Sequence, residues 1–330
     1  MKQNLQARIT GMGSYLPERV MTNREFESLI DTNDEWIESR TGIKERRIAA
    51  VDEFTSDMGT AAAIKALASA GLVASDIELI LVATMTPDYI STSTGALIQA
   101  NLKAERAAAV DIQAACSGFL YILSMAKAYI ESGMYSRILV VASEKMSTYV
   151  DYTCRGTSIL FGDGAAAAVV SNEGEGLCID TVCLGADGNL AQLVIVPGGG
   201  VRHPPSKESL EARLHYFKME GKEVFKHAVK RMSSAAKECL GRVGLRDDQI
   251  SWLVPHQANL RIMDAIAKGF NIPPEKMYKT VHKYGNTSAS SVPIALDELT
   301  REHQLAQGEH VLLVAFGAGL TWGAAVLTKI

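Results

Sequence analysis

Short, continuous apolar runs alternate with amphipathic stretches along the chain. The segments 77–83, 138–143 and 311–316 are apolar at almost every position, which predicts strands buried on both faces of a sheet that helices cover. Between such runs, apolar residues recur at helical spacing, most clearly over 119–130. The pattern therefore predicts an α/β fold.

The apolar blocks repeat at a constant offset of 173 residues. GLVASDIELILVA aligns with GLRDDQISWLVPH, which matches Ile77 to Ile250, and SRILVVAS aligns with EHVLLVAF, which matches Ile138 to Val311. Each block has a Gly-Leu helix end, a polar turn and an apolar strand. Because solenoid repeats have periods of only about 20–50 residues, this offset indicates two fused, similar halves.

Two segments rich in polar residues, glycine or proline predict breaks in this pattern. SNEGEG (171–176) separates an apolar run from the next strand, so we expect an N-terminal half over 1–173 and a C-terminal half over 174–330. PGGGVRHPPS (197–206) can continue neither a helix nor a strand, and it predicts a surface loop.

Composition narrows the classes of function. The chain has 330 residues, 47% hydrophobic and 21% charged, and its net charge of −4 argues against a nucleic-acid partner. Five cysteines, an odd number without metal-ligand spacing, predict neither a disulfide framework nor a metal site and fit a reducing, cytoplasmic location.

We expect no membrane segment and no secretory signal. The N-terminal segment MKQNLQARITGMG lacks an apolar core. Residues 311–328 are free of charge and reach the lower length limit of a spanning helix, but Gly317, Gly319 and Gly323 divide them. Two buried strands joined by a glycine turn explain this stretch better.

Cys116 lies in DIQAACSGF, between the apolar strand expected at 107–112 and the helix at 119–130. The free backbone N–H groups and the positive dipole end of a helix N-terminus favour a thiolate, and so a nucleophile. A small buried apolar residue is the alternative, and the position alone fits both.

His256 and Asn286 also lie at strand or helix ends. His256 directly follows the strand in WLVPH, where the carboxyl ends of strands line crevices, although a hydrogen-bonded core histidine is the alternative. Asn286 follows Gly285, which permits an unusual backbone, and precedes a Ser/Thr-rich run that we expect to cap a helix. An ordinary turn asparagine is the alternative there.

The repeat connects these three residues. At the same offset Cys116 corresponds to Ala289, so the Asn286 turn is the counterpart of the cysteine turn, and His256 corresponds to Ala83. If the halves pack about a pseudo-twofold axis, Cys116, His256 and Asn286 converge in one crevice.

Two reaction types use cysteine, histidine and asparagine in this order. In papain-like hydrolases, which include thioesterase and amidase chemistry, the histidine deprotonates the cysteine; in decarboxylating condensing enzymes, histidine and asparagine hydrogen-bond an enolate. The papain signature CG[SA]C[WY] is missing, and the duplicated α/β pattern does not fit that fold. A non-catalytic acyl-coenzyme A binding protein would not need the three residues.

DIQAACSGF, VPHQANLRI and YGNTSASSVP resemble, in this order, the three active-site signatures of the β-ketoacyl-acyl carrier protein synthase III family. The resemblance covers nearly the whole chain through GSYLPERVMTN, NDEWIESRTGIKERR, CRGTSILFGDGAAAAV, MEGKEVFKHAV and FGAGLTWGAAVL. It implies the thiolase fold, a five-layer αβαβα sandwich of two pseudo-symmetric halves, and a homodimer.

The resemblance also implies the reaction. An acyl-coenzyme A primer, such as acetyl-coenzyme A or another short acyl thioester, condenses with malonyl-acyl carrier protein. The products are 3-oxoacyl-acyl carrier protein, carbon dioxide and coenzyme A, and the step initiates fatty acid biosynthesis without a cofactor or metal. Relatives that prime polyketide, branched-chain or quinolone synthesis carry the same motifs and stay open as alternatives.

By the same resemblance, Cys116 accepts the acyl group, His256 and Asn286 promote decarboxylation, and the N–H groups of Cys116 and Ala318 bind the oxyanion. Six further residues match family positions that contact coenzyme A: Trp36, Arg40, Arg155, Gly221, Phe225 and Asn259. Of these, Trp36 and Arg155 sandwich the adenine. Ile90 is the candidate for a residue that gates the acyl pocket across the dimer interface.

A basic patch is expected for the acidic carrier protein. Lys222, Lys226 and Lys230 recur every fourth residue and share one helix face, for which a solvated surface is the alternative. The family resemblance matches Lys226, Arg261 and Lys268 to docking positions near the tunnel mouth.

Overall fold

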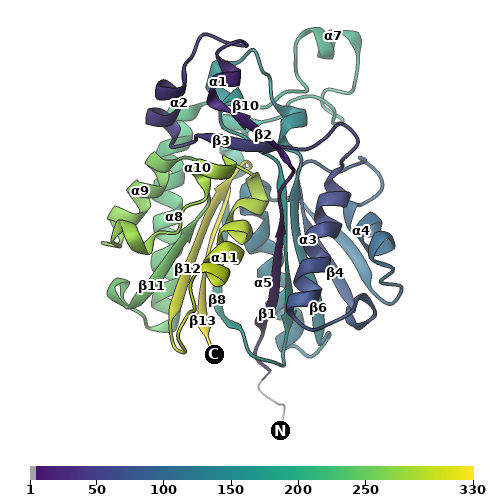
Figure 1. Ribbon diagram of the computed structural model, residues 1–330, viewed down its shortest axis with the longest axis vertical. Helices are drawn as coiled ribbons and strands as arrows, with labels where there is room; N and C mark the ends of the chain where they lie inside the picture. The colour runs from purple at the N-terminus through teal and green to yellow at the C-terminus, as the bar shows by residue number, and fades with distance from the viewer. Residues whose placement is uncertain (1–4) are drawn as a thin grey trace.

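Nine strands joined edge to edge form the frame of the computed structural model, which describes residues 5–330 (Figure 1). Their order is β11-β12-β13-β8-β1-β7-β6-β4-β5. The strands are β1 (Arg8–Tyr15), β4 (Leu79–Ala83), β5 (Ala108–Ile112), β6 (Arg137–Glu144), β7 (Gly164–Ser171), β8 (Leu177–Ala186), β11 (Ile250–Pro255), β12 (His310–Gly317) and β13 (Thr321–Lys329).

This row of strands consists of two similar sheets. From the outside inwards, β4-β6-β7-β1 of the first sheet corresponds to β11-β12-β13-β8 of the second, and β5 extends the first. In both, two parallel strands are followed by antiparallel ones. Two residue pairs, Arg8 with Cys178 and Ile9 with Leu177, join the sheets where β1 and β8 begin.

Helices make the remaining layers. Between the sheets lie α5 (Gly118–Glu131) and α11 (Ser291–Glu302); α3 (Thr55–Ser69) and α4 (Thr94–Leu102) cover the first sheet, and α8 (Gly221–Val243) and α9 (Leu260–Gly269) the second. The predicted five-layer sandwich is confirmed.

Alternate residues of the same strand face different layers. Ile138 and Val140 of β6 belong to the core around α5 and α11, whereas Leu139 and Val141 pack with α3. This arrangement explains the continuous apolar runs, because both faces of the strand are covered by helices.

The offset of 173 residues is visible in the backbone. It relates β6 to β12, and the first residue of α5 to the first residue of α11. Ala115 and Ser288, which are also 173 positions apart, both have positive φ angles, of 44° and 53°. Residue 173, the expected end of the N-terminal half, lies in the connection between β7 and β8. The boundary between the halves stays a prediction.

One strand differs from its prediction. The apolar run 107–112 suggested a buried strand, but β5 pairs with β4 at the edge of the first sheet and its side chains are exposed or half-buried. An apolar run does not reveal whether a second neighbour covers the strand, so edge and central strands look alike in the sequence.

The glycine-divided stretch at 311–328 forms the antiparallel pair β12 and β13, as predicted. Within residues 5–330, no helix has both the length and the apolar character needed to cross a membrane. The predicted surface loop at 197–206 is largely exposed and leads into a short helix, α7 (Lys207–Glu211).

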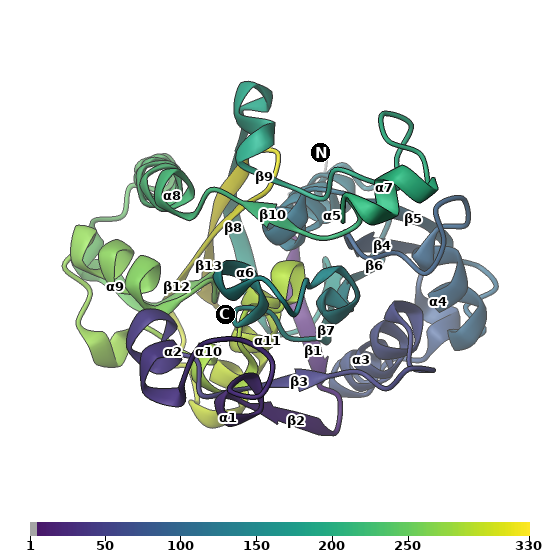
Figure 2. The same ribbon diagram turned by 90° about the horizontal axis from the view of Figure 1, so that it is seen from above.

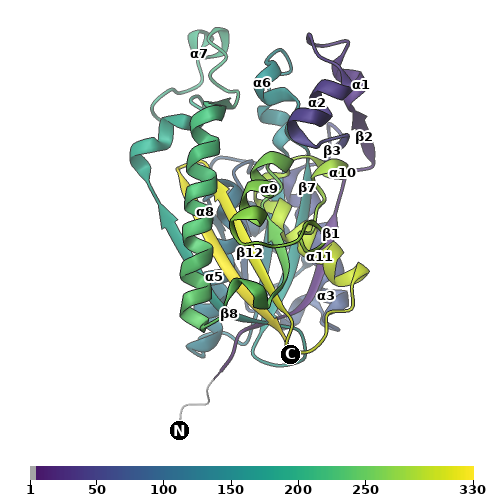
Figure 3. The same ribbon diagram turned by 90° about the vertical axis from the view of Figure 1, so that its left-hand side faces the viewer.

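Smaller elements gather at one end of the sandwich (Figure 3). Here β2 pairs with β3 and β9 with β10, and α6 lies near the middle of the molecule when it is seen from above (Figure 2). These elements are β2 (Arg19–Thr22), α1 (Asn23–Phe26), α2 (Asp34–Thr41), β3 (Glu45–Ile48), α6 (Arg155–Ser158), β9 (Val194–Ile195), β10 (Lys218–Met219) and α10 (Val281–Tyr284).

A buried arginine ties this end to the body. Arg46 of β3 donates hydrogen bonds to Asn23 Oδ1 at 2.9 Å and to the carbonyl of Ile159 at 2.7 Å, and it stacks on the ring of Phe26. Since Ile159 directly follows α6, Arg46 fixes α1 relative to α6, next to the cavity described below.

Candidate active site

A cavity of about 960 Å³ opens beneath α2 and α6. Twelve of the thirteen predicted catalytic, coenzyme A and docking residues line it: Trp36, Arg40, Cys116, Arg155, Gly221, Phe225, Lys226, His256, Asn259, Arg261, Asn286 and Ala318. Both halves contribute to it, so the predicted convergence on one crevice is seen in the structure. Lys268 lies outside the lining, in the last turn of α9.

Cys116 occupies a tight turn of residues 115–117 that connects β5 to α5. Its side chain is buried, and its Sγ donates to Ser288 Oγ at 3.5 Å. Gly118 begins the helix, where a Cβ would lie only 2.9 Å from the Cβ of Ala83. The missing side chain thus lets α5 start close to the end of β4.

Cys116 lies at the start of α5, as expected, but burial opposes the expected activation of its thiol. Burial raises the pKa of Cys116 to about 12; the hydrogen bond to Ser288 lowers it and the charge of Glu144 raises it further. The side chain is desolvated by contacts with the second half, which a helix-end argument does not include. Burial therefore favours the neutral thiol of Cys116, whose attack then needs a proton acceptor.

His256 follows β11, as predicted, and is held from both its backbone and its ring. Its N–H donates to the carbonyl of Val314 at 2.7 Å, and its Nδ1 lies 2.6 Å from Ser291 Oγ. Ser291 Oγ also accepts the N–H of Gln257 at 3.4 Å. When the Ser291 hydroxyl donates its proton to Nδ1, the imidazole proton lies on Nε2. Burial lowers the pKa of His256 to about 3, so the ring is neutral.

Asn286 is fixed in the same way. Its Oδ1 accepts the backbone N–H of Ser288 at 2.9 Å, which leaves the amide NH2 as a donor at the cavity. Gly285 before it has φ 64° and ψ −153°, and a Cβ there would lie 2.8 Å from the carbonyl oxygen of Leu160. The expected special backbone at Gly285 is confirmed.

The end of β12 packs against the cysteine turn. A Cβ on Gly317 would lie 2.6 Å from the backbone nitrogen of Cys116, so no side chain fits there. The next residue, Ala318, lines the cavity beside Cys116. The two backbone segments expected to bind an oxyanion are therefore close together.

Two hydroxyl side chains at the site were not predicted as functional. The Ser/Thr-rich run was expected to cap α11, but Ser290 at the cap position makes no side-chain capping bond. Instead, Ser288 contacts Cys116 and Ser291 contacts His256. The only sign of these roles in the sequence was that Ser288 and Ser291 closely follow Asn286, by two and by five residues.

The expected adenine clamp is closed in the structure. The guanidinium carbon of Arg155 lies 3.8 Å from the centre of the Trp36 ring, and that of Arg40 lies 5.8 Å from it. A flat base enters between Trp36 and Arg155 only if Arg155 moves away, so the sandwich stays a prediction and requires this movement. Asn259 caps α9 by accepting the N–H of Ile262, which leaves its amide NH2 for a ligand.

The predicted lysine face is exposed on α8, where Lys226 forms an ion pair with Glu223 at 2.7 Å. Lys226 and Arg261 lie at the cavity, while Ile90 is 90% exposed and does not line it. The roles of Lys226, Arg261 and Ile90 stay predictions.

Among residues 5–330, no cluster of three or more His, Cys, Asp or Glu side chains has the arrangement of a metal site.

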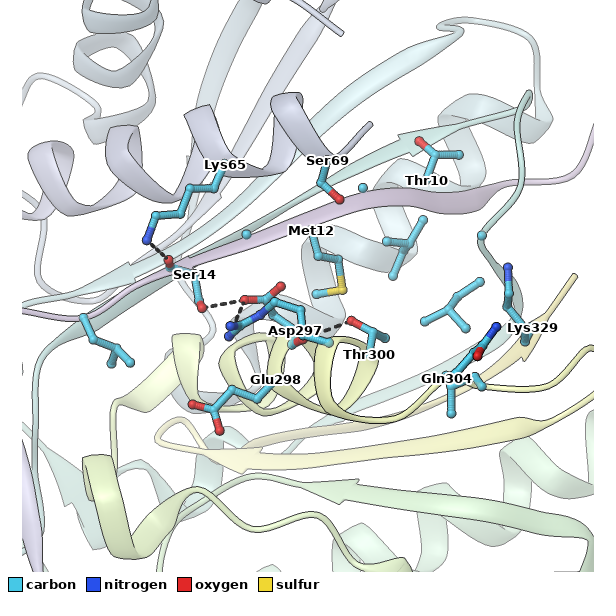
Figure 4. Close-up of a pocket in the computed structure, with 18 of the residues that line it drawn as sticks. Thr10, Met12, Ser14, Lys65, Ser69, Asp297, Glu298, Thr300, Gln304 and Lys329 are labelled. Atoms are coloured by element: carbon cyan, nitrogen blue, oxygen red, sulfur yellow. Dashed lines mark hydrogen bonds and ion pairs between the residues drawn. The ribbon is translucent and has the colours of Figure 1, made fainter. Parts of the chain in front are cut away.

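A second cavity lies over β1, between α3 and α11 (Figure 4). Its polar side chains bind one another: Ser14 donates to Asp297, Asp297 pairs with Arg301 at 3.3 Å, and Lys65 donates to the carbonyl of Ser14. We assign no chemistry to it because these groups already have partners.

Comparison with known proteins identifies the family. Models of 3-oxoacyl-[acyl-carrier-protein (ACP)] synthase III and of its C-terminal part match residues 110–188 and 240–329. A beta-ketoacyl-[acyl-carrier-protein] synthase III from Chlamydia pneumoniae is 53% identical and spans 100% of this chain and 99% of its own length. The chain belongs to the β-ketoacyl-acyl carrier protein synthase III family.

Solved structures of similar proteins have the same fold. The 3-oxoacyl-[acyl-carrier-protein] synthase III of Aquifex aeolicus VF5 superimposes with a TM-score of 0.90 at 43% identity, covering 98% of this chain and 100% of its own. A priming β-ketosynthase of the R1128 polyketide pathway gives 0.91 at 37% identity, covering 100% and 98%. Membership of the synthase III family removes the papain-like hydrolase alternative.

We expect Gly317→Ala to destabilise the protein by about 1–3 kcal/mol, because the new methyl group overlaps the backbone of Cys116. Gly241→Ala is the matched control: it lies in α8, a Cβ there meets nothing within 4 Å, and it should stabilise by about 0.5–1 kcal/mol. Thermal unfolding measures both. Equal midpoints for Gly317→Ala and the wild type would contradict the close approach.

Proposed function

We propose that the protein catalyses the decarboxylative Claisen condensation of an acyl-coenzyme A primer with malonyl-acyl carrier protein, the initiating step of fatty acid biosynthesis. The observation that carries this proposal is one cavity, in a member of the synthase III family, at which Cys116, His256 and Asn286 meet. We favour acetyl-coenzyme A or another short acyl thioester as the primer.

In the first half-reaction, the sulfur of Cys116 attacks the thioester carbonyl of the primer. The N–H groups of Cys116 and Ala318 donate to the developing oxyanion, and coenzyme A leaves as a thiolate. Support for this assignment comes from the close packing of the backbone at Gly317 against the Cys116 turn.

In the second half-reaction, the carboxylate of the malonyl group leaves as carbon dioxide. Nε2–H of His256 and the NH2 of Asn286 donate to the thioester oxygen, which becomes an enolate oxygen. The enolate carbon then attacks the acyl group on Cys116. The assignment is supported by the fixed Nδ1 and Oδ1 atoms, because each residue keeps a neutral donor directed away from its partner.

The residues expected to bind coenzyme A are part of the same proposal. Trp36, Arg155 and Arg40 bind the adenine end of coenzyme A, and Gly221, Phe225 and Asn259 line the path of its pantetheine arm. No cofactor or metal takes part in this scheme, because acyl transfer, oxyanion binding and enolate stabilisation are all assigned to groups of the protein.

We also propose a cytoplasmic homodimer. Five free cysteines fit a reducing compartment. The outer edge of β5 and the exposed side chain of Ile90 offer a strand edge and an apolar residue to a second copy.

The function is tested by separating the two half-reactions. We expect Cys116→Ala to abolish acylation, and His256→Ala and Asn286→Ala to keep acylation but lose malonyl decarboxylation about 100-fold or more, because their hydrogen bonds are made to the enolate. Intact-protein mass spectrometry with a panel of acyl-coenzyme A thioesters, together with carbon dioxide release, measures both.

Cys154→Ala is the control for this test, because Cys154 is the exposed cysteine. An acyl group mapped to Cys154, or a loss of acylation by the histidine and asparagine variants in proportion to turnover, would contradict the proposal. The preferred thioester distinguishes housekeeping fatty acid synthesis from a specialised priming role such as that of the R1128 enzyme.

For the adenine clamp, Trp36→Ala and Arg155→Ala should raise KM for acetyl-coenzyme A several-fold. Acyl-pantetheine fragments should react as with the wild type, because they lack the adenine. Arg24→Ala, an exposed arginine on nearby α1, is the control. Equal KM values for both variants and the wild type would rule out the clamp.

For the carrier protein, we expect Lys226→Glu with Arg261→Glu to raise KM for malonyl-acyl carrier protein, more at low than at high salt, since rim charges mainly affect encounter. Acylation by acetyl-coenzyme A should stay near wild type. Lys237→Glu, an exposed lysine farther along α8, is the control. We also propose Lys268 as a docking residue. Unchanged kinetics with malonyl-acyl carrier protein at low salt would show that docking occurs elsewhere on the protein.

A further inference from the structure

A buried carboxylate lies close to the nucleophile without a cationic partner. Glu144, the last residue of β6, has no exposed surface. Its oxygens accept hydrogen bonds from Thr84, Thr86, the backbone of Met85 and Ser288, and no cation within residues 5–330 pairs with it. Burying an acidic group in this way is costly, so its presence at an active site suggests a role in the chemistry.

Ser288 connects this carboxylate to the cysteine. The thiol of Cys116 donates to Ser288 Oγ at 3.5 Å, and the hydroxyl of Ser288 donates to Glu144 Oε1 at 3.0 Å. The three side chains therefore form a continuous path for a proton, directed from sulfur to carboxylate. Ser288 belongs to the second half of the chain, while Cys116 and Glu144 belong to the first.

The path supplies a step that the proposed function leaves open. A neutral thiol must lose its proton as it attacks, and His256 is poorly placed to take it. Its Nδ1 is bound to Ser291. In the proposed function its Nε2 carries the proton that is donated to the enolate.

We propose that Glu144 accepts the proton of Cys116 through the hydroxyl of Ser288 during acyl transfer and returns it after condensation. Ser288 contacts the reacting sulfur and is a catalytic residue in this scheme. Glu144 acts through Ser288.

The protons and bonds balance over the cycle. While the bond between Sγ and the acyl carbon forms, the thiol proton moves to Ser288 and the proton of Ser288 moves to Glu144. Coenzyme A leaves as a thiolate and takes a proton from solvent. After the enolate attacks, the bond between Sγ and the acyl carbon breaks, and the cysteine thiolate regains its proton along the same path.

The scheme also removes negative charge at the right moment. Between the half-reactions Glu144 is neutral, so the anionic malonyl group approaches a site without a neighbouring carboxylate. Burial raises the pKa of Glu144 to about 7, which suits a group that takes up and releases a proton near neutral pH.

Few other charges influence this titration. Among residues 5–330, Cys116 and Tyr149 are the titratable side chains whose pKa the charge of Glu144 raises. Lys145 follows Glu144 in sequence, but its ammonium group donates to the carbonyls of Ala50 and Glu53.

The test follows acylation of Cys116, and thus rests on the proposed function, in single turnovers of the full-length protein with acetyl-coenzyme A. The wild-type rate should rise with pH through neutrality, since only ionised Glu144 accepts the proton. Glu144→Gln and Ser288→Ala should each acylate about 100-fold more slowly at neutral pH and lose this rise. The double variant should be no slower than the slower single one.

Ser290→Ala is the matched control. Ser290 is buried on the same turn, but its hydroxyl donates to the carbonyl of Thr287, so rate and pH profile should match the wild type. If Glu144→Gln does not fold, Ser288→Ala decides the question, because it removes one hydroxyl group.

The outcomes separate the two proposals. A wild-type acyl group on another residue would overturn the proposed function. The relay alone would be overturned if Ser288→Ala still formed the acyl group on Cys116 and its rate rose with pH as in the wild type. This holds even if the absolute rate were lower, because Ser288 would then only position the thiol.

Discussion

The close packing of two left-handed turns, one from each half, is the constraint on which the site depends. The turns at Ala115 and Ser288 lie against each other and against the end of β12, where a Cβ on Gly317 would lie only 2.6 Å from the backbone nitrogen of Cys116. This contact brings Cys116 within hydrogen-bond distance of Ser288, a residue far away in sequence. Larger side chains at these positions would separate the two halves of the reaction centre.

The same packing determines how the donors are prepared. His256 and Asn286 each use one polar atom to bind a group on or next to the Ser288 turn, so the other atom has a fixed direction and state. Neutral donors held in a desolvated site need little reorganisation when charge develops on a substrate oxygen. The second half thus both positions these groups and removes water from around them.

The sequence predicted the parts that depend on local pattern and on the repeat. The apolar runs of β6 and β12 indicated strands covered on both faces, and their offset related the Asn286 turn to the Cys116 turn. The exposed edge of β5 and the raised pKa of Cys116 were missed, because both depend on which segments pack nearby in three dimensions. The serines after Asn286 were interpreted as caps because nothing in the sequence shows that His256 and Cys116 lie beside them.

The stack of Arg155 on Trp36 affects how tightly a nucleotide could be held there. A base entering between them exchanges an existing cation–π contact, worth about 0.5–1 kcal/mol at an exposed site, for contacts of its own. The net gain is the difference between the two, which would limit the affinity of this stack for a nucleotide that has already given up its acyl group. If coenzyme A binds there as proposed, such a self-closing stack favours its rapid departure, and with it the entry of the next substrate through the same opening.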